Sequence, residues 1–209
     1  MNQLLDVDAD EVLIREFVER EAHHHGLRLT AEDYYKLEDD GCRYELIDGV
    51  VCMTPSPTRI HQVVSWEISL QLGAFLKKNP VGEAVSDTDV HLGKGPRGGD
   101  LVYRPDLIFF KAGRIPQEAE RYEQIPDLVV EISSLSTRRY DRETKKADYE
   151  RFGVTEYWII DPQRASMTFF RLHQGQYVEV PPDGDMFRST AVSGFVLDLN
   201  DVRKAFKPA

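Results

Sequence analysis

Two acidic residues lie inside or beside apolar stretches, where a carboxylate is costly unless it is paired or binds a cation. Glu131 lies within residues 128–132, which read LVVEI, and Asp106 directly precedes residues 107–110, which read LIFF. If the two stretches form neighbouring strands, both carboxylates lie on one face of a sheet. Hard oxygen ligands of this kind suit Mg²⁺ or Mn²⁺, with waters completing the coordination.

A lysine that could work with these acids follows on the next predicted helix. Lys145 and Lys146 are adjacent, so only one of them can face the sheet, and Lys145 shares a helical face with Tyr149. An ammonium group there can orient or deprotonate a water and stabilise negative charge on a phosphate. The residues alone leave a plainer alternative open, in which Asp106 is an ordinary strand-end acid and both lysines are solvated.

The element that must position these residues is a strand–helix–strand unit. Residues 128–132 are apolar on both faces, which indicates a strand buried on both sides. A Ser/Thr-rich segment can cap a helix over about 138–152 that ends at Gly153. A second buried strand follows at 156–160. The short connections imply at least one parallel strand pair.

Other elements are predicted from periodicity and turn residues. Asp48-Gly49 between two apolar runs is typical of a type I′ hairpin over residues 43–53. The remaining predictions are a helix over 58–78, strands over 84–92, 101–110, 167–172, 176–180 and 194–199, and a polar, frayed tail from 201 onward.

Two motifs are interpreted conservatively. Residues 93–99 match G-x-G-x-x-G, but a strand follows them and Pro96 lies inside, so a flexible hairpin tip is favoured over a dinucleotide site. His23, His24 and His25 follow an acidic N-terminal helix predicted over 6–22. Because three adjacent imidazoles cannot face one point on a helix, a solvated helix end is favoured over a metal site.

Composition limits the class of protein. A chain of 209 residues without internal repeats predicts a helical extension at 1–28 and one domain at 29–209. No apolar run is long enough to cross a membrane, no signal peptide opens the chain, and two cysteines form no disulfide framework, so a cytoplasmic protein is expected. The net charge of −10 disfavours nucleic-acid binding unless a local basic patch or a divalent metal offsets it.

Six segments in order resemble the PD-(D/E)XK nuclease superfamily and, more narrowly, its Uma-two family. They are RYELIDG at 43–49, TPSPTRIHQ around His61, RPDLIFF at 104–110, PDLVVEISSLST at 126–137, the spacing Asp141…Lys145…Tyr149…Gly153-Val154, and EYWIIDP at 156–162. They cover roughly residues 29–199. The resemblance implies an α/β, restriction-endonuclease-like fold: a mixed central β-sheet flanked by helices, here with an extra N-terminal helix.

The resemblance also implies roles for individual residues. Asp106 and Glu131 would bind the metal, Glu45 would be a further acid lining the site, and Lys145 would complete the catalytic set. His61 matches a position that would face the same cleft, with helix capping or packing as the alternative.

One departure from the superfamily pattern concerns the lysine. The residue two positions after Glu131 is Ser133, so the lysine of the E-x-K motif is missing from the strand. Lys145 on the following helix fits its place, and Lys146 is the second choice.

The implied reaction is Mg²⁺- or Mn²⁺-dependent hydrolysis of phosphodiester bonds in DNA, with RNA not excluded, by an enzyme that is a homodimer by analogy. The alternative is a catalytically silent nuclease-fold protein that binds nucleic acid or a protein partner. Lys145 pointing away from the acids would favour the silent protein. A basic rim at the cleft would favour nucleic-acid binding; its candidates are Lys77, Lys78, Arg97, Arg104, Arg138 and Arg139.

Overall fold

The computed structural model describes residues 23–116 and 118–207, so the helix predicted over 6–22 lies outside the described part. The strands are β1 (Arg43–Ile47), β2 (Val50–Thr54), β3 (Gly82–Ser86), β4 (Val90–Lys94), β5 (Asp100–Tyr103), β6 (Leu107–Lys111), β7 (Leu128–Ile132), β8 (Glu156–Asp161), β9 (Ser166–His173), β10 (Gln176–Glu179), β11 (Met186–Arg188) and β12 (Val196–Asp198). The helices are α2 (Ala31–Tyr34), α3 (Arg59–Leu76), α4 (Arg138–Tyr140), the π-helical turn η1 (Asp141–Lys145), α5 (Lys146–Phe152) and α6 (Leu199–Ala205).

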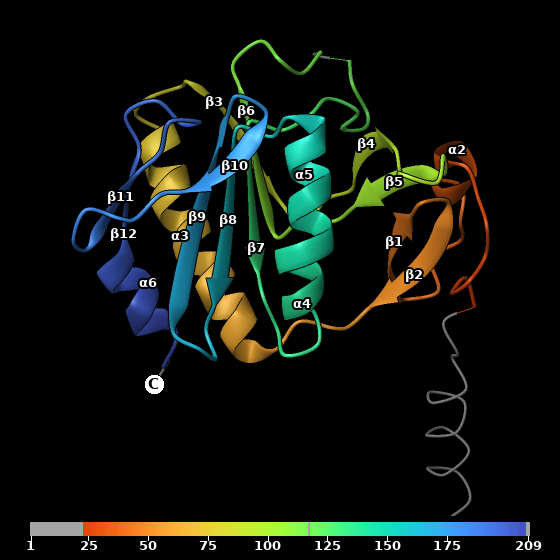
Figure 1. Cartoon of the computed structure of the whole chain (residues 1–209), viewed down its shortest axis with the longest axis horizontal. Helices are drawn as coiled ribbons and strands as arrows, with labels where there is room; N and C mark the ends of the chain where they lie inside the picture. The colour runs from red at the N-terminus through yellow and green to blue at the C-terminus, as the bar shows by residue number, and fades with distance from the viewer. Residues whose placement is uncertain (1–22, 117, 208–209) are drawn as a thin grey trace, which may run out of the picture.

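A mixed six-stranded sheet of order β10-β9-β8-β7-β6-β3 forms the centre, and an antiparallel sheet of order β2-β1-β5-β4 stands beside it (Figure 1). A third, two-stranded sheet joins β11 to β12. In the large sheet β7 and β8 pair in parallel, while the other neighbouring strands are antiparallel. The predicted strand–helix–strand crossover is therefore confirmed, and the sheet is mixed as expected.

Helices cover both faces of the large sheet. The α4–η1–α5 helix lies in front of β7, and α3 lies behind the sheet (Figure 1). Side chains of β7 alternate between two cores: Leu128, Val130 and Ile132 pack with α3 and α6, whereas Val129 packs with α5. Glu131 shares the parity of Val129, so it points to the face that the α4–η1–α5 helix covers.

The helix predicted over 138–152 is present but is not uniform. Its middle turn, η1, is wider than an α-helical turn, and such turns often occur at functional sites. The helix ends at Gly153 in a left-handed conformation (φ 84°), as predicted for a glycine at this position.

Two long predicted strands are wrong, because each divides between the two sheets. Residues 84–92 contain the end of β3 and the start of β4, separated by a polar turn in which Asp87 has φ 53°. Residues 101–110 divide into β5 and β6 at Arg104-Pro105, where proline lacks the N–H that a ladder needs. The chain thus changes sheets immediately before Asp106.

The C-terminal segment also differs from its prediction. Instead of a frayed tail, residues 199–205 form α6, whose Asp198 cap accepts hydrogen bonds from Asn200 N and Asp201 N. Leu199 and Val202 are three positions apart, lie on one side of α6 and are buried against the core. This apolar side is enough to hold the helix in place although most of its other residues are polar.

The predicted hairpin of β1 and β2 is confirmed, with positive φ at Asp48 (52°) and Gly49 (79°). The Asp48 carboxylate accepts hydrogen bonds from the backbone N–H groups of Arg97 and Gly99, at 2.9 and 2.8 Å. The glycine-rich loop is therefore the tip of the β4–β5 hairpin, as predicted, and it supports the neighbouring turn.

The histidine run forms no joint site in the described residues. His24 Nε2 lies 3.0 Å from the Glu38 carbonyl, while His25 Nδ1 accepts a hydrogen bond from Met53 N at 3.1 Å. Among the described residues, no helix has the length and hydropathy that crossing a bilayer requires.

Candidate active site

A cleft of about 640 Å³ opens between the small sheet, the start of α3 and the α4–η1–α5 helix. The acids and the lysine predicted from the sequence, with His61, all line it; they are Glu45, His61, Asp106, Glu131 and Lys145. The structure thus brings together residues that are up to 100 positions apart in the chain.

Asp106 and Glu131 meet because β6 and β7 are antiparallel neighbours. Leu107 stands opposite Val130, so the next position on each strand places Asp106 beside Glu131. Asp106 Oδ2 accepts a hydrogen bond from Ile132 N at 2.6 Å, which ties the start of β6 to the end of β7. The two strands are neighbours, as the expectation required, and both carboxylates line the same cleft.

Lys145, and not Lys146, faces these acids. Its ammonium nitrogen lies 2.9 Å from Glu131 Oε1 and 2.8 Å from Glu45 Oε1, and the three side chains are at most 7% exposed. Lys146 points to the other side of the helix, with its nitrogen 4.8 Å from the centre of the Phe170 ring. Of the two lysines considered from the sequence, Lys145 is therefore the one that lies beside the acids.

Glu45 reaches the cleft from the small sheet. It is 2% exposed on β1, and besides Lys145 its Oε1 accepts a hydrogen bond from Arg104 N at 3.0 Å. Since Arg104 belongs to the segment that passes from one sheet to the other, Glu45 links the two sheets at the cleft floor.

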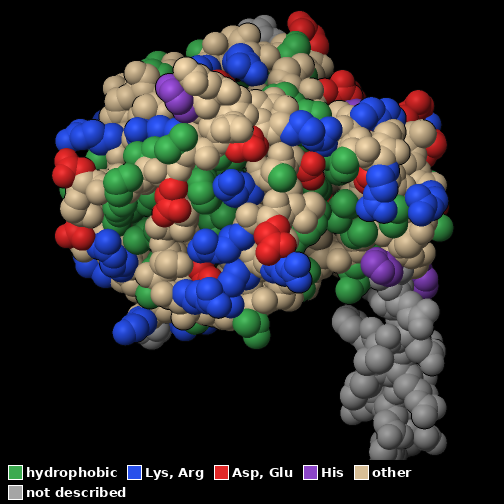
Figure 2. All heavy atoms as spheres, viewed as in Figure 1, with side chains coloured by type: hydrophobic (Ala, Val, Ile, Leu, Met, Phe, Trp, Pro, Cys, Tyr) green, Lys and Arg blue, Asp and Glu red, His purple; other side chains and the backbone are tan. Residues whose placement is uncertain are grey.

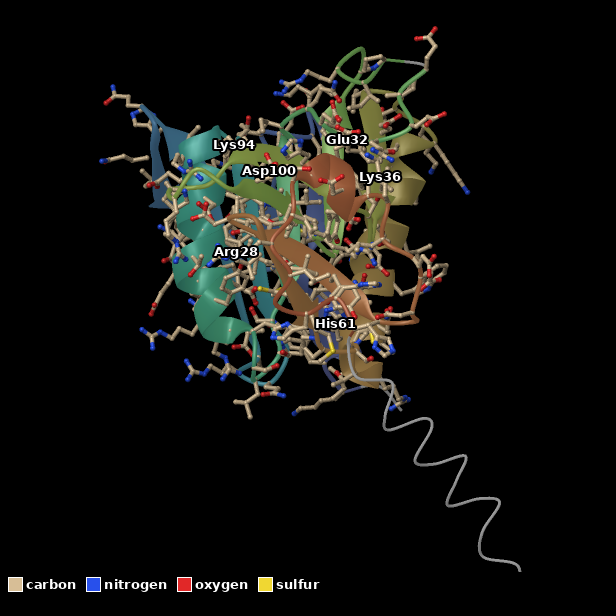
Figure 3. All side chains as sticks on the ribbon, turned by 90° about the vertical axis from the view of Figure 1, so that its right-hand side faces the viewer. Arg28, Glu32, Lys36, His61, Lys94 and Asp100 are labelled. Atoms are coloured by element: carbon tan, nitrogen blue, oxygen red, sulfur yellow. The ribbon has the colours of Figure 1, made fainter. Side chains whose placement is uncertain are left out.

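His61 contributes in both of the ways that the sequence left open. Its backbone N–H is capped by the Thr58 hydroxyl at 3.3 Å, and its ring Nε2 lies 3.0 Å from Asp106 Oδ1. His61 thus orients the carboxylate that was expected to bind a metal. Figure 3 shows where this histidine lies: it is at the lower end of the molecule, away from the Lys94–Asp100 ion pair (2.8 Å), which lies beside α2.

Burial is the largest influence on the pKa values of the charged groups at the cleft floor. Burial raises the pKa of the Glu131 carboxyl well above its ordinary value; Lys145 opposes this shift, and the neighbouring acids add to it. Burial also raises the pKa of Asp141. Burial alone would lower the pKa of Lys145, but Glu131, Glu45 and Asp141 outweigh it and hold that pKa well above its usual value.

Two residues of the site were not assigned roles from the sequence. The Tyr149 hydroxyl donates to Glu131 Oε1 at 2.8 Å, and Asp141 Oδ2 accepts from the Ser133 hydroxyl at 2.8 Å. Asp141, Lys145 and Tyr149 are spaced by four, so they lie along one side of the helix. That spacing was visible in the sequence, but the partners of Asp141 and Tyr149 were not.

The donors present fit a divalent cation held by few protein ligands. Oε2 of Glu45 and Oε2 of Glu131 accept no hydrogen bond from the described residues and are not fully buried. In the described part, no group of three or more His, Cys, Asp or Glu is placed to hold a metal ion. Mg²⁺ commonly binds through one or two carboxylates plus waters and substrate phosphates, so a small set of carboxylates is compatible with it.

The predicted basic rim is only partly present. Arg104 lines the cleft and pairs with Asp89 at 2.7 Å. Arg138 and Arg139 directly follow the cleft residue Thr137. Lys77 and Lys78 follow the far end of α3, and Arg97 supports the β1–β2 turn, so these three do not contribute to the rim.

Comparisons with known proteins agree with this architecture. The model of the Uma2 family, described as "Putative restriction endonuclease", matches residues 31–200. A search among curated proteins returned no match. A crystal structure from Anabaena variabilis, described as that of "a putative nuclease belonging to DUF820", superposes with a TM-score of 0.71 at 21% identity, covering 85% of this chain and 99% of that one. That likeness shows a shared fold, and the family match extends over most of the chain: this protein belongs to the Uma2 family.

Proposed function

We propose that this protein is a divalent-metal-dependent endonuclease of restriction-endonuclease-like fold that hydrolyses phosphodiester bonds of DNA. The observation that carries the proposal is the position of Lys145, whose ammonium group is buried between Glu45 and Glu131 beside Asp106. The description of the Uma2 family and the naming of the Anabaena variabilis protein as a nuclease support the same class of reaction.

Each residue of the cleft floor has a physical task in this reaction. Asp106 and Glu131 would hold Mg²⁺ or Mn²⁺, with Glu45 as a further acid of the site. Once bound, the cation supplies Lewis-acid stabilisation of negative charge and a more acidic water. Lys145 orients the attacking water and offsets charge on the phosphate.

Two further side chains keep the acids in place. His61 fixes Asp106 through its Nε2, and the Tyr149 hydroxyl fixes Glu131. Partners of this kind orient ligands, and their removal commonly lowers activity by about 10–100-fold. Because Lys145 faces the acids, the condition that would have favoured a silent protein is not met.

The test is cleavage of supercoiled plasmid by purified protein with Mg²⁺ or Mn²⁺, beside the variants Asp106→Asn, Lys145→Met and Lys146→Met. The expected result is nicking or cutting by wild type and Lys146→Met, and none by the other two. An RNA substrate is run in parallel.

Two outcomes would contradict the proposal. Cleavage that survives Asp106→Asn would come from another site or a contaminant. If wild type bound nucleic acid with metal present but cut neither DNA nor RNA, the binding-only alternative would replace the enzyme.

A further inference from the structure

The cleft that holds the acids has exposed apolar side chains on its border, and their role is not accounted for by phosphodiester hydrolysis. Leu135 is 73% exposed on the segment between β7 and α4, and Met53 is 49% exposed at the end of β2. Both line the cleft, together with Pro55 and Pro57 of the β2–α3 connection. Large apolar side chains at the mouth of a polar site indicate a ligand that has an apolar surface of its own.

Hydroxyl groups stand among these apolar residues. Ser134, Ser136 and Thr137 line the cleft beside Leu135, and Thr58 lines it where α3 begins. Ser134 Oγ lies 2.9 Å from Ser136 Oγ and 3.2 Å from Thr137 Oγ1, so this wall carries several polar atoms in a small space. The border therefore offers apolar contact and hydrogen bonds together, which matches the faces and edges of a nucleobase.

A group of arginines adjoins the same wall; we call Arg138, Arg139, Arg142 and Arg164 the arginine tract. Arg138 binds Asp161 and lies 3.4 Å from Gln163, a cleft residue. The Arg164 backbone N–H donates to the same Asp161 at 3.1 Å. The pKa of Asp161 is lowered against the effect of burial, chiefly by the hydrogen bond from Arg138 and to a smaller degree by the charge of Arg142. Figure 2 shows Lys and Arg side chains gathered over α4 and the adjoining end of the large sheet.

The arginine tract carries more positive charge than its neighbours neutralise. Arg138 pairs with Asp161, and Arg139 pairs with Glu143 at 2.9 Å. Neither Arg142 nor Arg164 has an ion-pair partner within the part of the chain that the structure describes, and Arg142 Nε is buried without a hydrogen bond. On a chain of net charge −10, such a tract fits an anionic ligand, and a phosphate backbone is the one that a nuclease meets.

The depth of the reactive groups adds a geometric constraint. Lys145 and Glu131 are each 5% exposed, so a phosphodiester must enter the cleft to reach them. In a duplex the faces of the bases are stacked on one another and cannot contact Leu135 or Met53. A flexible single strand can enter and present an unstacked base to the border.

We infer that the substrate is an unpaired segment of nucleic acid, with a base held by Leu135 and Met53 and the backbone running over the arginine tract. This inference rests on the proposed function and names the class of nucleic acid on which it acts.

The first test compares two fluorescent probes by anisotropy: a single strand of ~12 nucleotides, within the usual site size, and the same sequence in a hairpin duplex. Wild-type protein is used in EDTA and, separately, with Ca²⁺. The single strand is expected to bind about tenfold more tightly, the effect of roughly one additional base contact. Equal or tighter duplex binding would overturn the inference while leaving the nuclease proposal intact. No binding of either probe in both conditions would contradict the proposed function as well.

The second test addresses the apolar border. Leu135→Ser and Met53→Ser should each weaken binding of the single strand by about fivefold to tenfold, with the duplex unaffected. The matched control is Leu70→Ser, because Leu70 is an apolar residue of α3 that is 52% exposed and does not line the cleft. Unchanged single-strand binding in both border variants would overturn the role given to these residues.

The third test addresses the arginine tract by salt dependence. Replacing Arg142 and Arg164 by Gln should reduce the slope of log affinity against log salt by about 1.4, which is about 0.7 for each lost single-strand phosphate contact. Lys78→Gln is the control, because Lys78 lies beyond the end of α3 that is farthest from the cleft. A slope identical to that of wild type would show that the backbone does not run over the tract.

Discussion

The Lys145 ammonium group lies 2.9 Å from the Glu131 carboxylate, and both side chains are almost completely buried. The two residues come from the helix and from the strand that precedes it, so one crossover unit supplies both charges. Glu45, 100 residues from Lys145, closes the arrangement from the second sheet. This arrangement is sensitive to loss of the cation, because both carboxylates would then stay buried without a positive charge.

Lys145→Met should abolish cleavage and weaken the fold. The substitution leaves Glu45 and Glu131 buried without their cation, and breaking such a pair costs about 3–5 kcal/mol. Cleavage should fall by at least about 100-fold, since charge stabilisation at the phosphate is lost. Activity is measured well below the melting temperature of the variant. Lys146→Met is the matched control, and full activity in Lys145→Met would contradict the site.

Glu131→Gln should stabilise the metal-free protein in a pH-dependent way. The pKa of the Glu131 carboxyl in the folded protein is raised well above 4.5, its value in the unfolded chain. At pH values between these two pKa values the native protein binds more protons than the unfolded chain, so it loses stability as the pH rises from the lower to the higher value. In EDTA near about pH 8, the variant should melt a few degrees higher than wild type. The difference should shrink as pH falls. A variant that melts lower than wild type at every pH would refute this expectation.

His61→Ala should reduce turnover without weakening substrate binding much. The ring holds Asp106 in position, and removal of such a partner typically lowers activity by about 10–100-fold. Steady-state cleavage of a short oligonucleotide separates kcat from KM, and the loss should appear in kcat. His91→Asn serves as the control, because His91 lies 3.3 Å from Asp100 in the small sheet, away from the cleft. A loss confined to KM would assign His61 to substrate binding instead.

Gly99→Ala should destabilise the protein, and Gly73→Ala should stabilise it. A Cβ at Gly99 would lie 2.1 Å from the Asp48 carbonyl group, so the β4–β5 tip would have to move away from the β1–β2 turn. A Cβ at Gly73 meets nothing within 4 Å, and alanine in a helix is favoured over glycine by about 0.5–1 kcal/mol. Thermal melting of the two variants checks both directions. A stable Gly99→Ala protein would show that the two turns are not tightly packed.

Local sequence determined most of the secondary elements of this protein. The apolar run at 128–132, which contains the single acid Glu131, specified a buried strand. Gly153 specified a helix end, and Asp48-Gly49 specified a hairpin turn. These features depend on neighbouring residues, because periodicity and backbone conformation are local properties. The order of motifs also indicated which acids and which lysine belong to one site.

Only the tertiary structure decided how the site is assembled. Pro105 divides one apparent strand between two sheets, and that change of sheet places Asp106 beside Glu131 and brings Glu45 to Lys145. The partners of His61 and Tyr149 follow from the same packing. An apolar pattern reports which face of a strand is buried but not which distant strand or helix covers it, because that choice depends on packing of the whole chain.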